Sequence, residues 1–96
     1  MEHFEFDPIK SERNKKRHGV DLEWAQGLWD VTHIIIPAKD VIGESRGLIL
    51  AKIGSKCYAA AVFTRRGEAI RLISCHRADH RLERIYENRV QSQENE

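Results

Sequence analysis

The segment that constrains the fold most strongly is C-Y-A-A-A-V-F-T, residues 57–64. In an extended strand its side chains would be apolar on both faces. A strand of this kind belongs in the middle of a sheet, where other layers cover both of its faces. Turns flank the segment on both sides: Gly54-Ser55 joins it to a strand over 46–53, and Arg66-Gly67 joins it to a strand over 68–74. The sequence therefore predicts an antiparallel meander with residues 57–64 at its centre.

A strand and two helices are predicted ahead of this meander. Residues 2–6 alternate as a short strand, and Asp7 then serves as the N-cap of a surface helix over residues 8–17. Asp21 caps a second helix, which directs one apolar stripe toward the core. The members of this stripe are Leu22, Ala25, Leu28 and Trp29.

A further strand and a C-terminal helix complete the predicted fold. The strand covers residues 34–36, and an amphipathic helix follows the strand over 68–74. The apolar positions of this helix are Ala78, Leu82, Ile85 and Tyr86. The predicted fold class is therefore α+β, in the order β-α-α, a meander of three or four antiparallel strands, and a helix. Residues 1–90 are expected to form one domain, and residues 91–96 a frayed tail.

Basic residues gather in two places, although the formal net charge of the 96 residues is only +1. The segment Lys10–Arg17 holds five basic residues and a single acid, and the segment 65–84 holds six arginines and three acids. Guanidinium groups match phosphate oxygens with a planar pair of donors. This distribution predicts a local surface for a polyanion rather than general stickiness.

Arg71 and two histidines are candidates for chemistry. A two-residue period puts Arg71 in a row with Ile73 and Cys75, and a charge in such an apolar row must be paired or must point into a cleft. Imidazole is the side chain that titrates near neutral pH, which selects His76 and His18 as acid–base groups. Each histidine also has a structural explanation, His76 as a helix cap or surface group and His18 as a cation at a helix C-terminus. In the same way, Glu44 and Arg46 are placed to pair with each other.

Neither cysteine indicates a metal site or a secreted protein. Cys57 and Cys75 lack metal-motif spacing, the N-terminus has no signal pattern, and no apolar run approaches a membrane span. We expect reduced, partly buried thiols in a cytoplasmic protein without a membrane contact. His76 and His80 beside Cys75 could hold a metal only with a third ligand such as Cys57, and no ligand spacing elsewhere supports it. No metal or cofactor is therefore expected.

Several short segments, in order and with matching spacing, resemble the BrnT family of toxins over roughly residues 4–87. These segments are Phe4–Asp7, Asn14–Val20, Gly43–Arg46, Ile53-Gly54, Thr64–Gly67 and Ile70–Ala78, with Glu83 and Tyr86. The resemblance implies a small RelE-like, metal-independent ribonuclease that acts in the cytoplasm and inhibits translation. It further implies a BrnA-type antitoxin as partner, a dimer of heterodimers, and binding of operator DNA only through the antitoxin complex.

Metal-free RNA cleavage needs a base, an acid and cations around the phosphate, and the resemblance and the residues together select candidates. The predicted catalytic residues are Arg71, His76, His18 and Arg66, and the predicted RNA-binding residues are Lys15, Lys16, Arg17, Arg46, Arg77 and Arg81. This chain has Cys75-His76 where the family usually has alanine and arginine, so a permanent cation is replaced by a titratable group. Two alternatives therefore remain: a catalytically inactive homologue that acts as a transcriptional co-regulator with its antitoxin, and a nucleic-acid-binding module that uses Lys10–Arg17.

Overall fold

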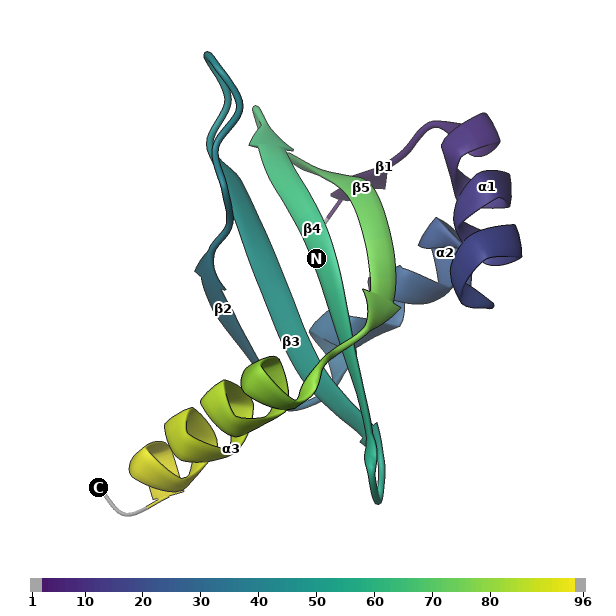
Figure 1. Ribbon diagram of the computed structural model, residues 1–96. Helices are drawn as coiled ribbons and strands as arrows, with labels where there is room; N and C mark the ends of the chain where they lie inside the picture. Colours follow the sequence, from purple (N-terminus) through teal and green to yellow (C-terminus); the bar gives the residue numbers. More distant parts are fainter. Residues whose placement is uncertain (1–2, 95–96) are drawn as a thin grey trace.

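In a computed structural model, which describes residues 3–94, the chain forms one sheet with strand order β1-β5-β4-β3-β2 (Figure 1). The strands are β1 (His3–Glu5), β2 (His33–Pro37), β3 (Arg46–Gly54), β4 (Cys57–Arg66) and β5 (Ala69–Arg77). Strands β2 to β5 pair in antiparallel fashion, and β4 occupies the centre of the sheet. The predicted α+β class, the meander and the central position of residues 57–64 are confirmed. The first strand adds a parallel pair, because β1 lies beside β5.

The first two helices begin at the predicted caps, but the predicted second helix is α-helical only over Leu22–Ala25 and continues as a 3-10 helix. The helices are α1 (Pro8–His18), α2 (Leu22–Ala25), the 3-10 helix η1 (Gln26–Asp30) and α3 (His80–Glu94). The carboxylates of Asp7 and Asp21 accept hydrogen bonds from backbone amides at 2.8 Å, as predicted for N-caps. Gly19, with φ of 85°, ends α1 in the left-handed region that favours glycine. No helix within residues 3–94 is long and apolar enough to cross a membrane.

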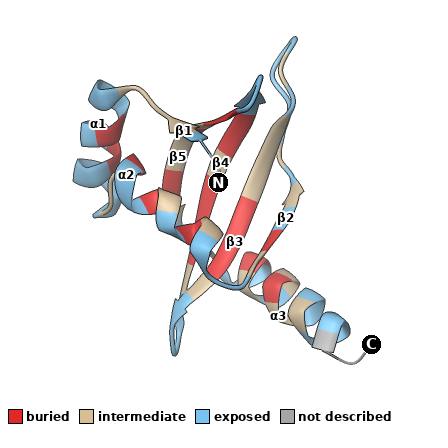
Figure 2. Ribbon diagram, turned by 180° about the vertical axis from the view of Figure 1, so that it is seen from behind, coloured by how far each residue is buried: buried red, intermediate tan, exposed pale blue. Residues whose placement is uncertain are grey.

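Two apolar clusters lie on opposite faces of the sheet, since Ala59 and Ala61 belong to one cluster and Ala60 to the other. Figure 2 shows buried segments on the strands and on the helices that cover them. On one face, α2 and η1 pack on Ile49, Ala61 and Leu72, and we call this the α2 face. On the other, α3 packs on Leu50 and Ala60, and we call this the α3 face. Helix α1 lies at the β5 edge of the sheet (Figures 1 and 2). Since α3 covers only one end of its face, much of β5 stays partly exposed there (Figure 1).

Strand β5 is longer than the sequence predicted. It runs to Arg77 rather than ending at Ser74, because β4 is long enough to supply pairing partners as far as Ala59. Helix α3 therefore starts only at His80. Asp79 directly precedes it, and its carboxylate accepts a hydrogen bond from the amide of Leu82 at 2.9 Å. Cys75 and His76 consequently lie in a strand, so His76 is not a helix cap.

The ends of the described chain also bear on two predictions. Helix α3 continues to Glu94, so residues 91–94 of the expected tail are helical, and residues 95–96 lie outside the described part. Residue 2 of the first predicted strand likewise lies outside it.

A β-bulge in β5 decides which side chains share a face. Val62 pairs with Ser74 and the next residue, Phe63, pairs with Leu72, so Ile73 is an extra residue in the ladder. Side chains alternate along a strand, and one inserted residue reverses the alternation beyond it. The predicted row of Arg71 with Ile73 and Cys75 is therefore wrong. Cys75 turns into the core of the α2 face, where it is fully buried.

Candidate functional site

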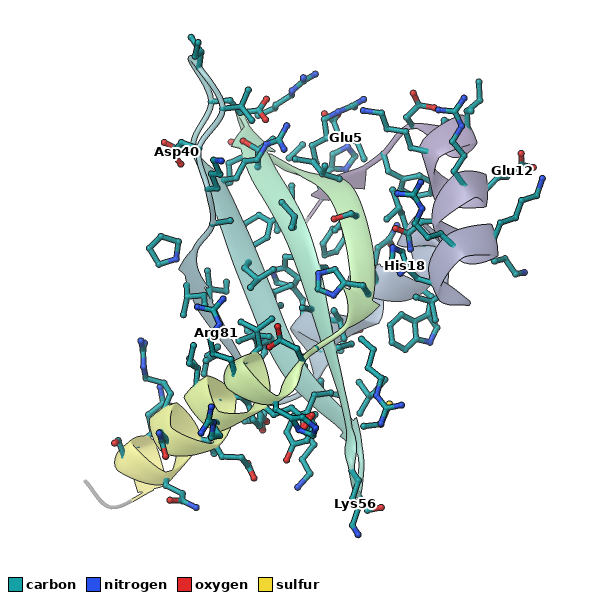
Figure 3. All side chains as sticks on the ribbon, in the orientation of Figure 1. Glu5, Glu12, His18, Asp40, Lys56 and Arg81 are labelled. Atoms are coloured by element: carbon teal, nitrogen blue, oxygen red, sulfur yellow. The ribbon has the colours of Figure 1, made fainter. Side chains whose placement is uncertain are left out.

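The two histidines proposed from the sequence lie next to each other. His18 is the last residue of α1 and His76 is near the end of β5, and their ring centroids are 5.9 Å apart. His76 pairs with Ala60, so its side chain lies on the α3 face, where it is half-buried. Figure 3 shows His18 beside β5 at the lower end of α1. Two titratable groups from distant parts of the chain thus meet at one edge of the sheet.

The hydrogen bond of His76 indicates which ring nitrogen is available. Nδ1 of His76 lies 2.9 Å from the carbonyl oxygen of Arg77. A carbonyl only accepts, so Nδ1 carries the proton in this contact. In the neutral ring the lone pair is then on Nε2, which is the arrangement that a general base requires.

Arg71 lies on the same face of β5 as His76 because of the bulge at Ile73. Its guanidinium Nη1 is 3.5 Å from Oε1 of Glu5, which the parallel β1–β5 pair places opposite it. The two side chains remain 30% and 37% exposed, so this pair is accessible rather than buried. The expectation that Arg71 is either paired or open to a cleft is met by a solvent-accessible pair.

A narrow groove separates α1 from β5, and basic side chains form its helical wall. The lining residues are Lys10, Arg13, Asn14, Arg17, His18, Ile73 and Ser74. Positions 10, 13, 14 and 17 repeat at helical spacing and so lie on one side of α1. Arg17 was predicted individually as an RNA-binding residue, whereas Lys10 and Arg13 of this wall were predicted only as part of the basic segment Lys10–Arg17. Their spacing relative to Asn14 was the signal that could have singled them out.

The other predicted lysines of α1 do not line this groove. Lys15 borders a separate hollow with the acidic side chains of Glu12, Asp21 and Glu23. Lys16 is exposed and lines neither of these two depressions. In Figure 3, Glu12 marks the outer side of α1, away from the sheet.

Arg46 and Arg66 lie at the far end of the sheet, around a larger open hollow. The end of β2, the loop before β3 and the end of β4 form this hollow, which also includes Arg65 and Phe63. Nε of Arg46 contacts Oε1 of Glu44 at 2.8 Å, so these two residues pair as expected. By register, Arg46, Thr64 and Arg71 form one row across the α3 face, which extends the positive surface from β5 toward this hollow.

Arg77 and Arg81 lie outside the groove. Arg77 is exposed and pairs with Ala59, which belongs to the α2 face and thus to the side opposite His76. Arg81 is exposed on α3, where Figure 3 labels it. Of the predicted set, the structure brings the rings of His18 and His76 together and places Arg17 with His18 along the groove. Arg71 shares a face with His76, but it pairs with Thr64 whereas His76 pairs with Ala60, so the two lie apart along the strand.

A family model described as the ribonuclease toxin BrnT of a type II toxin–antitoxin system matches residues 6–81. The chain belongs to the BrnT family. Among solved structures, the ribonuclease toxin BrnT of Brucella abortus is similar with a TM-score of 0.65 and 19% identity. That alignment covers 83% of this chain and 100% of the Brucella chain, and at this identity it supports the fold alone. A search of curated proteins found no match. A type II system implies an antitoxin partner for this BrnT-family chain.

The cysteines and histidines of this BrnT-family chain do not assemble a metal site within residues 3–94, where no group of three potential ligands occurs. Cys75 points to the face opposite His76, and His80 instead contacts Glu83 at 3.5 Å. Burial raises the pKa of the Cys75 thiol to about 12, so the group stays protonated and unreactive. Cys57 is a free, exposed thiol.

Proposed function

We propose that this BrnT-family chain is a metal-independent endoribonuclease whose reaction takes place where His18 and His76 meet, with Arg71 on the same face of β5 as His76. The single observation that carries the proposal is the 5.9 Å separation of the two imidazole rings, with Nε2 of His76 available as a base. An imidazole pair can supply both the base and the acid of phosphodiester cleavage near neutral pH.

The proposed reaction uses His76 as the base. Its Nε2 removes the proton of a 2′-hydroxyl, and that oxygen forms a bond to the adjacent phosphorus. The bond from phosphorus to the 5′-oxygen breaks, and protonated His18 gives its proton to this leaving oxygen. The products are a 2′,3′-cyclic phosphate and a free 5′-hydroxyl. Arg71 lies on the same face and stabilises the negative charge that develops on the phosphoryl oxygens.

The wall of α1 is proposed to hold the flanking phosphates of the RNA. Lys10, Arg13 and Arg17 line the groove that leads past His18. Phosphate contacts position a nucleic acid without reading its sequence, and they weaken as the salt concentration rises. Binding of RNA to this chain should therefore fall steeply with salt.

Inhibition of translation in the cytoplasm and neutralisation by a BrnA-type antitoxin are the cellular part of the proposal. Cleavage of cellular RNA would reduce translation, and the family implies an antitoxin that prevents it. The exposed apolar side chains of Ile35, Val41 and Ile42 offer a surface for such a partner. We further propose a dimer of heterodimers that binds operator DNA only through the antitoxin, which the size of the co-expressed complex and its DNA binding would test.

The decisive experiment measures RNA cleavage by the purified chain in EDTA and identifies the product ends. We expect His76→Ala and His18→Ala each to lower the single-turnover rate by about 10²–10⁴-fold, the range for loss of a general acid or base. The matched control is His80→Ala, since its side chain is 98% exposed on α3. Products with 2′,3′-cyclic phosphate ends would support the mechanism.

Other outcomes have separate meanings. Activity that needs a divalent cation, or full activity in His76→Ala, would contradict the mechanism. RNA binding without cleavage by the folded wild-type chain would favour the alternative of an inactive homologue that acts as a co-regulator with its antitoxin.

A further inference from the structure

We infer that Asn14 is the positioning residue that holds His18 and His76 in register, a role that rests on the proposed function. Asn14 is only 7% exposed, and its side chain extends from α1 to the backbone of β5. Its Oδ1 accepts a hydrogen bond from the amide of Cys75 at 3.0 Å, and its Nδ2 donates to the carbonyl of Cys75 at 2.8 Å. Nδ2 also donates to the carbonyl of Val20 at 2.7 Å.

These hydrogen bonds replace a missing strand. Strand β1 pairs with β5 only as far as Arg71, so the outer backbone groups of Cys75 have no strand beside them. Backbone groups removed from water need partners, and an amide offers the same donor and acceptor as a peptide. Asn14 pairs with Cys75 as a neighbouring strand would, and this contact docks α1 on the edge of the sheet.

The same side chain reaches both segments that carry the histidines. His76 follows Cys75 directly, so a bond to the backbone of Cys75 fixes the position from which the His76 ring projects. His18 lies between Asn14 and Val20, and the bond to Val20 closes the turn in which His18 sits. One buried amide thus sets the relative position of the two rings, although its hydrogen bonds go to backbone groups of Val20 and Cys75 and not to the rings.

Ser11, the other buried polar residue of α1, bonds to a different element and supplies a matched control. Ser11 is also 7% exposed, and its Oγ accepts a hydrogen bond from the amide of Leu22 at 2.9 Å. Ser11→Ala removes a buried hydrogen bond between α1 and α2, but it leaves the contact with β5 intact. Stability lost by α1 can therefore be separated from displacement of the histidine pair.

The experiment combines single-turnover RNA cleavage with an NMR measurement that needs no RNA. In Asn14→Ala we expect the maximal rate to fall at least about tenfold with little change in the RNA concentration at half-saturation, since small misplacements of reacting groups cost up to about 10²-fold. The NOE between the His18 and His76 rings should be present in the wild type and in Ser11→Ala, and lost in Asn14→Ala. Ser11→Ala should keep the wild-type rate per folded molecule.

Asn14→Gln keeps the result interpretable if Asn14→Ala does not fold. It retains the amide but lengthens the side chain by one methylene, so α1 stays docked at a shifted position. We expect a melting temperature closer to that of the wild type, with a lowered rate and a weakened NOE. A wild-type NOE in the Asn14 variants would overturn the inference. A wild type that does not cleave RNA would refute the proposed function alone, and the NOE comparison would still decide the role of Asn14.

Discussion

Replacement of Arg71 by alanine tests whether this cation serves the fold or the reaction. Its ion pair with Glu5 has a long contact of 3.5 Å, and both side chains stay roughly one-third exposed. Exposed pairs of this kind contribute only about 0–1 kcal/mol to folding, because water and salt screen them. We therefore expect Arg71→Ala to change the free energy of unfolding by no more than about 1 kcal/mol, and a domain of this size then shifts its melting temperature by at most about 8 °C.

The expected effect on cleavage is much larger. A preorganised donor aimed at developing charge is worth about 10²–10³-fold in rate, so Arg71→Ala should slow single-turnover cleavage by that factor. The assay uses a labelled RNA with enzyme in excess, together with urea unfolding of the same preparations. Glu5→Gln removes the ion pair but leaves the guanidinium, and it should keep the wild-type rate.

Two results would refute this reasoning. Arg71→Ala with an unchanged rate would show that the guanidinium does not contact the transition state. A loss of several kcal/mol in stability, matched in Glu5→Gln, would show that Arg71 is a structural partner of Glu5. Arg81→Ala is the control for a general loss of positive charge, because Arg81 lies away from the groove on α3.

Two further predictions concern the core. A Cβ at Gly47 would lie 2.7 Å from Cζ of buried Phe63, whose ring packs on Trp29. Gly47→Ala should therefore lower the free energy of unfolding, measured with urea, by about 1–3 kcal/mol. Gly27→Ala is the control because its Cβ would meet no atom within 4 Å, and an equal loss of stability there would contradict the packing argument. A cysteine thiol in the unfolded chain ionises near pH ~8.5, whereas burial raises the pKa of Cys75 in the folded chain to about 12. Between these values the folded state keeps a proton that the unfolded state loses. The free energy of unfolding should therefore fall as the pH rises from about 9 toward 12. Urea unfolding of Cys75→Ala across this range should show a shallower decline, by up to about 1.4 kcal/mol per pH unit, and parallel curves would count against the assignment.

Local chemistry made much of the fold predictable from the sequence. Asp7 and Asp21 have side chains that satisfy free helix amides, and Gly19 and Gly67 tolerate a positive φ, so the boundaries they mark do not depend on distant contacts. An apolar β4 must be covered on both faces, which alone places it at the centre of the sheet. His18 and His76 were accessible to prediction for a similar reason, since their chemistry belongs to the residue type.

The sequence could not show that His18 and His76 meet, nor that Asn14 joins their two segments, because both facts depend on α1 docking beside a strand far along the chain. Sequence alone determined the order of strands and helices, although not the end of β5, and which side chains can carry charge or transfer protons. Only the tertiary structure decided which of them share a face. The bulge at Ile73 is the physical reason: pairing with β4 skips one residue, and every side chain after it, His76 included, turns to the opposite side of the sheet from the one that simple alternation predicts.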